Sequence, residues 1–383
     1  MKIDRISLKI IPDSKARETL EAKMQSGALA VLASVPAGES TGKNEAKVID
    51  PKIALEKISW IETQIKGHEF SQLGQFDGLL NTLDGTSNKS NLGANLILSL
   101  SLCFTKLLAQ KGGLETWQLI SRISGSRPSL PLCFFNVIEG GVHTENSLPF
   151  QEYWFIPKIN SPKKALDQCQ TLLSQLKKKI NAEYGKVQMG AEGGYTVSSK
   201  NAEDGLKILR TAMEESGLDG NLGLDVAASS FSDITSYDLS YFRLLTQKYP
   251  LLAIEDPYSE EDWEDFSKIT EVLGSKVWIV GDDLTTTNPK LIKLAAERNA
   301  VNAVIIKTTQ IGTVSETIQA ANLAKSYGWK IIVANRGEET MDDFIADLSV
   351  GLGADGFKSG CPLQEERLVK YQRLIEIEKI CHI

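Results

Sequence analysis

Six short apolar runs between residues 222 and 358 limit the fold of this chain more than any other feature of its sequence. Each run ends on a charged or polar residue, and these end residues follow one another at intervals of 22 to 30 positions. Such an interval holds one strand and one helix, so the pattern predicts a β–α repeat with a functional group at the carboxyl end of every strand. In a closed barrel these groups would meet at one mouth. The end residues are Asp225, Glu255, Asp282, Lys307, Asn335-Arg336 and Lys358.

Two more strands are expected ahead of the repeats, at residues 130–137 and 150–156, joined by a turn that contains no helix. Two helical stretches follow, at about 162–184 and 201–216, before the first repeat begins. The sequence therefore predicts an α/β barrel of eight strands that opens β-β-α-α and continues with six β-α units. This ββαα(βα)₆ order differs from the plain (βα)₈ order.

The residues before the barrel predict a smaller α+β domain. The chain is therefore expected to divide into an N-terminal domain at residues 1–125 and a barrel domain at residues 126–383. Alternating apolar and polar residues favour strands in the smaller domain, and apolar residues at helical spacing favour helices. The expected strands are residues 3–11 and 28–35, and the expected helices are about 52–66 and 92–110.

A loop rich in glycine and hydroxyl residues, Ser40 among them, follows the second of these strands at residues 36–42. Two interpretations are open. The loop is either an ordinary hairpin turn, which the pattern alone favours, or a lid that hinges on Gly38 and Gly42.

Composition narrows the class of protein. The formal net charge of −7 argues against a dedicated nucleic-acid binder, and no apolar run is long enough to span a membrane. The start of the chain contains no apolar signal region, so a cytoplasmic protein without a membrane partner is expected. The five cysteines are scattered, which fits reduced thiols, and three histidines are too few for a histidine-based zinc site.

Asp225, Glu255 and Asp282 end three successive predicted strands. An anionic cluster of oxygen ligands suits Mg²⁺, with water and substrate oxygens completing the coordination. An aspartate at a strand end can instead cap the next helix. That alternative is weaker for Asp282, because Asn288 followed by Pro289 is a better cap for its helix. Three acids at matched positions therefore favour a metal site.

Two lysines, Lys307 and Lys358, end later strands. A single lysine in such a place usually extends toward solvent. Beside a bound cation, however, the ammonium form is disfavoured, and the amine can then act as a general base.

Two glutamates precede the repeats. Glu152 falls in a predicted strand, and Glu192 lies in the glycine-rich segment 190–194, where the backbone can approach a ligand closely. Together they could donate a proton to a leaving hydroxyl group, across the site from the lysines. Either one alone would more often be a solvated glutamate, and His143 is equally open to a structural or a functional role.

Short motifs follow one another along nearly the whole chain, at residues 34–42, 84–90, 93–95, 135–141, 151–152, 192–194, 225–229, 254–257, 281–285, 310–312 and 366–368. Together they resemble the motifs of the enolase (phosphopyruvate hydratase) family, and the β-β-α-α start of the barrel agrees with that family. The resemblance implies an enzyme that interconverts 2-phosphoglycerate and phosphoenolpyruvate. It further implies Mg²⁺ as cofactor, two ions per site, and assembly into a homodimer or larger homo-oligomer.

The resemblance also implies which residues bind metal and substrate. The implied metal ligands are Asp225, Glu255 and Asp282, with Ser40 of the loop reaching the second Mg²⁺. The implied substrate-binding residues are Lys358 at the carboxylate, Arg336 at the phosphate, and Gln151, Asn335 and Ser40.

Four further residues take catalytic roles by the same resemblance. Lys307 is implied to remove the proton beside the substrate carboxylate. Glu192, helped by Glu152, is implied to supply the acid for departure of hydroxide. His143 matches a loop histidine that closes over the substrate.

The chain departs from the family pattern at one end of the implied site. Enolases carry Ser-His-Arg-Ser before Gly-Glu-Thr, where this chain has Ala-Asn-Arg-Gly before Glu-Glu-Thr at residues 334–340. Asn335 thus replaces a histidine and Gly337 a serine, while Ala191 replaces the aspartate before the acid glutamate. Residues 13–18, Asp-Ser-Lys-Ala-Arg-Glu, replace Asp-Ser-Arg-Gly-Asn-Pro. These losses fall on the phosphate and hydroxyl end, and the metal and carboxylate end is unchanged.

Three functions stay open on this basis. The first is an active enolase, the second a lyase of the same chemistry acting on another hydroxy acid, and the third an enolase-like binding protein without catalysis. Retention of both lysines and all five acidic residues argues against the third, because a binding role would not need them. Arg336 and Ser40 favour the first over the second, since both serve a phosphorylated substrate.

Overall fold

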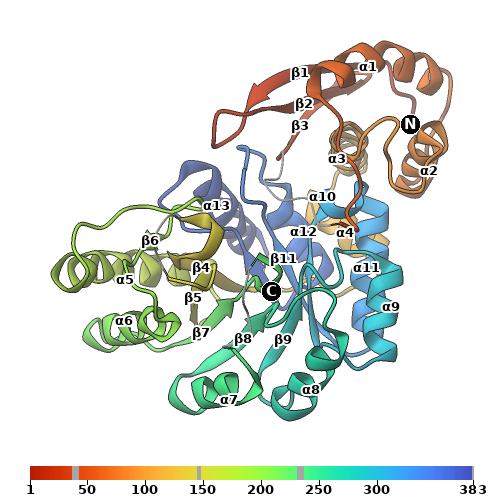
Figure 1. Cartoon of the computed structure of the whole chain (residues 1–383). Coiled ribbons are helices and arrows are strands. Elements are labelled where there is room, and N and C mark those ends of the chain that lie inside the picture. Colours follow the sequence, from red (N-terminus) through yellow and green to blue (C-terminus); the bar gives the residue numbers. More distant parts are fainter. Residues whose placement is uncertain (37–42, 145–147, 231–236, 382–383) are drawn as a thin grey trace.

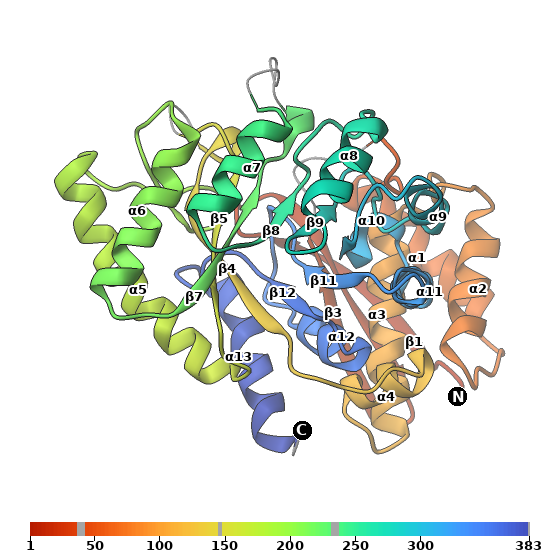
Figure 2. The same cartoon turned by 90° about the horizontal axis from the view of Figure 1, so that it is seen from below.

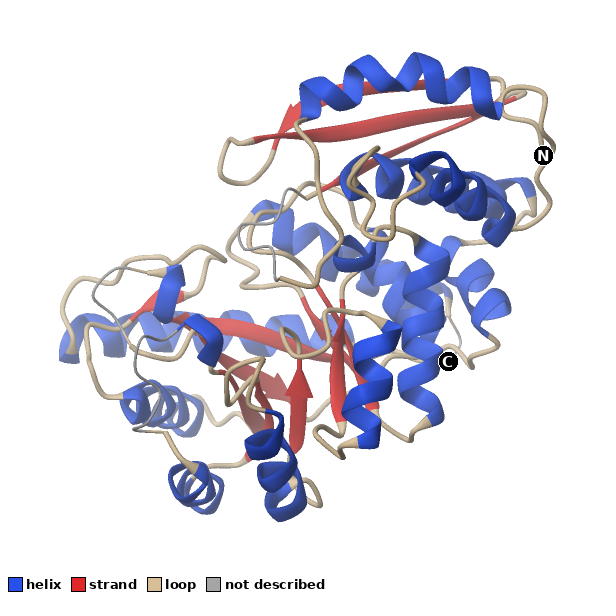
Figure 3. Ribbon diagram, turned by 45° about the vertical axis from the view of Figure 1, so that its right-hand side comes forward, coloured by secondary structure: helices blue, strands red, loops and turns tan. Residues whose placement is uncertain are grey.

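The computed structural model describes residues 1–36, 43–144, 148–230 and 237–381. Figure 1 shows a small sheet packed with helices, in red to orange, beside a larger barrel that the rest of the chain forms. Figure 3 shows the strands of the small sheet lying apart from the barrel strands.

The N-terminal part is an antiparallel sheet in the order β1-β2-β3, followed by four helices. Its elements are β1 (Arg5–Pro12), β2 (Glu18–Ser26), β3 (Leu29–Val35), α1 (Pro51–Ile65), α2 (Leu73–Asp84), α3 (Ala94–Lys111) and α4 (Thr116–Ser124). The two strands and two helices predicted for this region are confirmed as β1, β3, α1 and α3. The predicted domain boundary falls on Gly125, the C-cap of α4.

Three elements of this part, β2, α2 and α4, were not predicted. Strand β2 pairs with β1 on one side and with β3 on the other. It alternates the buried residues Leu20, Ala22 and Met24 with the less buried Glu21 and Lys23. The alternation is present in the sequence, but the charged outer face and the mixed composition conceal it.

Eight strands close into the barrel. They are β4 (Leu132–Glu139), β5 (Glu152–Pro157), β7 (Gly220–Asp225), β8 (Leu251–Glu255), β9 (Trp278–Gly281), β10 (Ala303–Ile306), β11 (Lys330–Ala334) and β12 (Gly356–Lys358). Strand β5 is antiparallel to both β4 and β7, and β12 pairs with β4 in parallel to complete the ring. The predicted ββαα(βα)₆ order is therefore confirmed. A two-residue strand, β6 (Tyr195–Thr196), adds to the outside of β4.

Helices surround the strands, as Figure 2 shows. They are α5 (Pro162–Glu183), α6 (Ala202–Glu215), α7 (Leu239–Lys248), α8 (Trp263–Leu273), α9 (Pro289–Glu297), α10 (Thr308–Ile311), α11 (Val314–Ser326), α12 (Phe344–Leu352) and α13 (Glu365–Ile380), with short 3₁₀ turns at Gly141–His143 and Ala228–Ser230. Among the described residues no helix is both long and apolar enough to cross a membrane.

Side chains fill the inside of the barrel, so the strands form a packed core and not a channel. A buried apolar cluster contains Phe134, Trp154, Ile156, Ala253, Val280, Ala303, Ile305, Ile332 and Ala334, which come from six of the eight strands. The solid interior leaves the carboxyl ends of the strands as the place where a ligand can enter.

The N-terminal domain caps one of the barrel helices. Ser101 Oγ on α3 accepts a hydrogen bond of 3.0 Å from the amide of Val314, and Asp77 Oδ2 on α2 accepts one of 2.9 Å from Ser315. Thr313 Oγ1 accepts from the next amide, at 3.2 Å. The first three amides of α11 are therefore satisfied, two of them across the domain interface.

Candidate active site

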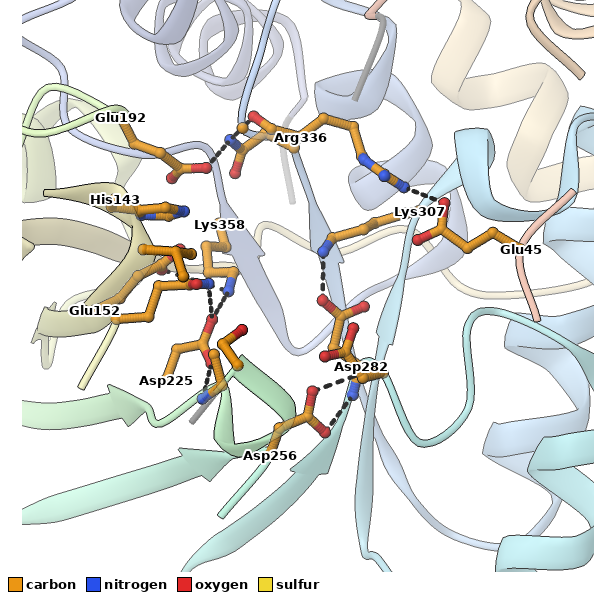
Figure 4. A pocket seen from close by; sticks show the side chains of 17 residues that line it. Glu45, His143, Glu152, Glu192, Asp225, Asp256, Asp282, Lys307, Arg336 and Lys358 are labelled. Atoms are coloured by element: carbon orange, nitrogen blue, oxygen red, sulfur yellow. Dashed lines mark hydrogen bonds and ion pairs between the residues drawn. The ribbon is translucent and has the colours of Figure 1, made fainter. Parts of the chain in front are cut away.

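A cavity of about 310 Å³ opens where the barrel strands end (Figure 4). Its walls contain ten of the predicted site residues: His143, Gln151, Glu152, Glu192, Asp225, Asp282, Lys307, Asn335, Arg336 and Lys358. Glu255 is fully buried behind the cavity wall and accepts a hydrogen bond from Lys358, which lines the cavity. Ser40 lies outside the described residues. One cavity thus brings together residues that are far apart in the sequence.

The three acidic strand ends lie side by side with the two lysines. Asp225 and Glu255 are register partners on the parallel strands β7 and β8. Lys358 Nζ lies 3.0 and 2.8 Å from the two oxygens of Glu255 and 3.5 Å from Asp225 Oδ2. Lys307 pairs directly with Asp282 Oδ2. Each lysine therefore faces a carboxylate from another strand.

Burial and charge set the protonation of this cluster. Burial, reinforced by Asp225, raises the pKa of Glu255 well above its ordinary value. Burial also acts to raise the pKa of Asp282, but Lys307 and Lys358 outweigh it and the pKa is lowered. Burial lowers the pKa of Lys358, yet Glu152 and Glu255 reverse this and raise it. The lysines are thus ammonium ions, and the carboxylates around them stabilise this charged form.

Asp256, which the sequence analysis did not select, belongs to the same cluster. One oxygen from each of Glu255, Asp256 and Asp282 lies within 4.8 Å of the others. Asp256 accepts hydrogen bonds from the amides of Asp282, at 3.1 Å, and Asp283, at 2.8 Å. Its own φ is +40°, which is uncommon for a residue with a side chain. Asp256 therefore holds the loop that presents Asp282.

The opposite wall of the cavity is acidic as well. Figure 4 shows His143, Glu152 and Glu192 on the left of the cavity, across from Lys307 and Asp282. One ligand atom from each of His143, Glu152 and Glu192 lies within 4.8 Å of the others. These three residues can therefore share protons over one short distance.

Glu139, at the end of β4, supports this wall from behind. Its Oε2 accepts a 2.9 Å hydrogen bond from the amide of Glu192 and lies 3.1 Å from His143 Nδ1. The glycines around Glu192 make the contact possible, because a Cβ on Gly190 would come within 2.7 Å of the Glu139 carboxyl. Glu139 lies in one of the recognised motifs, but the sequence alone predicts no role for it.

Glu192 and Glu152 differ in protonation. Burial acts to raise the pKa of Glu192, but Arg367 and His143 outweigh it and the pKa is lowered. Asn335 Nδ2 also donates to Glu192 Oε1, at 3.1 Å. Burial raises the pKa of Glu152 to about 7, although Lys358 opposes the shift. Glu192 is thus held as an anion, whereas Glu152 keeps its proton to a higher pH than a free glutamate does.

His143 carries a positive charge in this setting. Burial lowers its pKa, but the bond to Glu139 and the charges of Glu192 and Glu139 raise it to about 9. The histidine is therefore an imidazolium between two carboxylates, which fits a residue that contacts an anionic substrate.

The end of β11 forms the third wall. Arg336 Nη1 donates to Glu45 Oε2 at 2.8 Å, and its backbone amide donates to Glu339 Oε1 at 3.0 Å. Arg367 on α13 donates to the backbone oxygens of Arg336 and Gly337, both at 2.7 Å. Glu45 and Arg367 lie in or near recognised motifs, but sequence analysis assigned them no role, because their partners come from distant segments.

Comparison with known proteins agrees with the fold. The family model for the enolase N-terminal domain matches residues 3–120 of the sequence. The family model for the enolase C-terminal TIM barrel domain matches residues 127–243 and 233–381. Enolase B of Dictyostelium discoideum is 37% identical over 99% of this chain and 95% of its own length. The enolase of Thermococcus gammatolerans is 38% identical over the same shares, and Enolase 2 of Hevea brasiliensis is 36% identical over 96% and 92%. The chain belongs to the enolase family.

Proposed function

We propose that this chain catalyses the reversible dehydration of 2-phosphoglycerate to phosphoenolpyruvate. The observation that carries the proposal is a single cavity with Lys307 and Asp282 on one side and Glu192, Glu152 and His143 on the other. Lys358 lies between Glu152 and Glu255. Dehydration needs a base for the carbon-bound proton and an acid for the leaving hydroxide, and this arrangement offers both. Membership of the enolase family supports the same reaction.

Asp225, Glu255 and Asp282 are the proposed ligands of Mg²⁺. They offer carboxylate oxygens only, the donors that this ion prefers. Burial and the charge of Asp225 raise the pKa of Glu255 and so disfavour its carboxylate form, which a bound divalent cation would stabilise. When bound, Mg²⁺ polarises the substrate carboxylate and makes the adjacent carbon-bound proton more acidic. A second Mg²⁺ per site, with Ser40 as a ligand, is part of the proposal and depends on residues outside the described ranges.

Lys307 is the proposed base. Burial lowers its pKa, but Asp282 raises it more, so the amine keeps its proton while it pairs with that carboxylate. When the negative charge of Asp282 is neutralised, the pKa of Lys307 falls, so the amine can lose its proton and then accept one from the substrate carbon. Lys358, fixed between Glu255 and Glu152, stays cationic and is placed to bind the substrate carboxylate.

Glu152 and Glu192 are the proposed acid. Glu152, with its pKa raised to about 7 mainly by burial, is the member of the pair that carries a proton near neutral pH. Glu192 lies within 4.8 Å of it and is held as an anion by Arg367 and His143. A proton held by the pair is available to a hydroxyl group that leaves from this wall.

Arg336 is the proposed phosphate contact, with Asn335 and Gln151 as further contacts to the substrate. Gln151 Nε2 lies 3.4 Å from Asp225 Oδ2, so it borders the metal end. Gly337 lacks the hydroxyl donor of the serine in the family pattern, and Asn335 cannot carry the positive charge that a protonated histidine can. Weaker binding of the phosphorylated substrate is therefore expected.

A spectrophotometric assay of phosphoenolpyruvate formation from 2-phosphoglycerate tests the proposal. Turnover should require Mg²⁺ and should stop when EDTA is added. Asp225→Asn, which removes one ligand charge, should lower turnover and weaken Mg²⁺ binding. Absence of turnover at high enzyme concentration, with Mg²⁺ bound, would overturn the proposal and direct the assay to other hydroxy acids.

We further propose that the chain acts as a homo-oligomer in a reducing compartment such as the cytoplasm. Family membership supports the first part, and five buried cysteines with free thiols support the second. Light scattering of the purified protein measures the oligomeric state, and a monomeric mass at micromolar concentration would contradict it.

A further inference from the structure

The two segments that depart from the enolase pattern, residues 13–18 and 334–340, contact one another although more than 300 positions separate them. The amide of Ser14 donates to the backbone oxygen of Glu339 at 2.8 Å, and the amide of Glu339 donates to Ser14 Oγ at 3.1 Å. The first segment belongs to the N-terminal domain and the second to the end of β11. The two departures from the family pattern, which are separate in the sequence, thus meet at one contact in the structure.

An ion pair forms the centre of this contact. Arg17 Nη1 lies 2.7 Å from Glu338 Oε1, and Lys15 Nζ lies 3.7 Å from the same oxygen. The Glu338 side chain is fully buried, at 0% exposure, whereas that of Arg17 is half exposed, at 49%. A buried carboxylate is destabilising unless a cation or hydrogen-bond donors compensate it, so Glu338 depends on its basic neighbours.

The backbone of the N-terminal turn aims both basic side chains at Glu338. Asp13 Oδ1 accepts hydrogen bonds from the amides of Lys15 and Arg17, both at 2.9 Å. Ala16 has a φ of +59°, in the left-handed region that a tight turn requires. The turn is therefore held by its own aspartate.

Glu338 belongs to the segment that shapes the substrate end of the cavity. Arg336 and Gly337, directly before it, both line the cavity. Arg367 holds their backbone oxygens from the side of α13, and Lys370 pairs with Glu339 at 3.0 Å. The Arg17–Glu338 pair holds the same segment from the side of the N-terminal domain. Gly337 contributes no side chain to the cavity wall. The shape of the wall at the substrate end therefore depends on where the backbone of residues 336–339 and the Arg336 side chain lie.

We propose that Arg17, assisted by Lys15, is a positioning residue for substrate binding. Through Glu338 it fixes residues 336–339 against the N-terminal domain and thereby places the Arg336 guanidinium at the anionic end of the substrate. The charged pair stands where the family pattern has asparagine and glycine, so the two changes compensate one another. The identity of the anion as a phosphate rests on the proposed function.

A double-mutant cycle tests the inference, with Arg17→Gln, Glu338→Gln and the double variant. Each single change should raise KM for 2-phosphoglycerate about tenfold and leave kcat within about twofold, because Arg336 is displaced while the catalytic groups are not. The double variant should raise KM no further than either single change does, since each single change already breaks the pair. A second cycle with Arg17→Asn and Glu338→Gly, the residues of the family pattern, serves if the first double variant does not fold.

Lys89→Met is the matched control. Lys89 pairs with Glu316 across the same two domains, at 2.9 Å, and lies outside the cavity wall. Its loss should lower the melting temperature without moving KM. An equal rise of KM in this control would show that general loosening of the domains causes the effect, and it would overturn the inference.

Inorganic phosphate separates this inference from the proposed function. The affinity of each protein for phosphate, measured by the shift of its melting temperature, should change across the parent, the two single variants and the double variant in the same way as KM. If the parent protein does not turn over 2-phosphoglycerate, the proposed function fails, and the phosphate cycle still tests the role of Arg17. If turnover is normal but the two substitutions act additively on KM and on phosphate affinity, the positioning role is wrong.

Discussion

At the scale of single residues, the assignment of the base is the first point to test. Lys307→Ala should abolish exchange of the proton beside the substrate carboxylate with solvent, because this amine is the group proposed to take that proton. Loss of a general base lowers a rate by roughly 10²–10⁴-fold. Proton NMR of 2-phosphoglycerate in deuterated water measures the exchange. If exchange survived in a folded variant that still bound Mg²⁺, another group would be the base.

Asn335 offers a second test at this scale. Its Nδ2 donates to Glu192 Oε1 at 3.1 Å and to the backbone oxygen of Arg336 at 2.7 Å, so the side chain joins the acid wall to the phosphate wall. Asn335→His restores the residue of the family pattern and should raise kcat/KM for 2-phosphoglycerate by about tenfold, or about 1.4 kcal/mol. Asn335→Ala, the control, should lower it. An unchanged value for the histidine variant would mean that the site has adapted to asparagine.

The same residues show what a sequence can predict about a site. Asp225 and Lys307 were predicted because each ends a strand, and parallel strands in a barrel bring their ends together. Glu139 and Asp256 were not predicted, although both lie in recognised motifs. Their roles consist of hydrogen bonds to the amides of Glu192 and Asp282. Such contacts depend on how distant loops meet, which periodicity does not describe.

At the scale of elements, the start of α11 carries a prediction about stability and pH. Asp77, from α2, accepts from the Ser315 amide, and burial raises its pKa from 3.8 to about 6. A carboxyl group with a raised pKa binds its proton more tightly in the folded state. The free energy of unfolding should therefore fall as the pH rises from about 4 to about 6.

Asp77→Asn isolates this effect because the amide oxygen can still accept from Ser315 while the charge is removed. The variant should be more stable than the parent at pH 7, by about 1–3 kcal/mol, and should lose the pH dependence below pH 6. Asp77→Ala removes the helix cap as well and should gain less, by about 1 kcal/mol. Urea unfolding at pH 4.5 and pH 7 measures all three proteins. Equal pH dependence in parent and Asn variant would contradict a buried, titrating Asp77.

Elements with a regular period were predicted well, whereas contacts between the two domains were not. The barrel repeats follow from apolar runs at even intervals, so their order could be derived. Helix α11 was recognisable by its apolar face, but the cap that Ser101 and Asp77 provide was not. The donors and the acceptors lie more than 200 positions apart.

At the scale of the whole molecule, the acidic strand ends couple metal binding to the stability of the barrel. Asp225, Glu255 and Asp282 end three neighbouring strands of a ring that closes only when β12 pairs with β4. Burial, and after it the charge of Asp225, raises the pKa of Glu255, so folding disfavours the carboxylate form of this residue. A cation that binds only the folded protein must then stabilise the complete ring.

Mg²⁺ should therefore raise the melting temperature of the protein, and EDTA should reverse the rise. At a concentration one hundred times the Kd, the gain is about 2.7 kcal/mol, which corresponds to several degrees for a domain of this size. Glu255→Gln removes one ligand charge and relieves the repulsion, so this variant should melt above the parent without Mg²⁺ and respond less when Mg²⁺ is added. Differential scanning calorimetry at matched ionic strength, with Na⁺ in place of Mg²⁺, separates specific binding from screening. Equal shifts with Na⁺ and Mg²⁺ would mean that the strand ends hold no divalent ion, and the proposed metal site would then be wrong even if the protein is active.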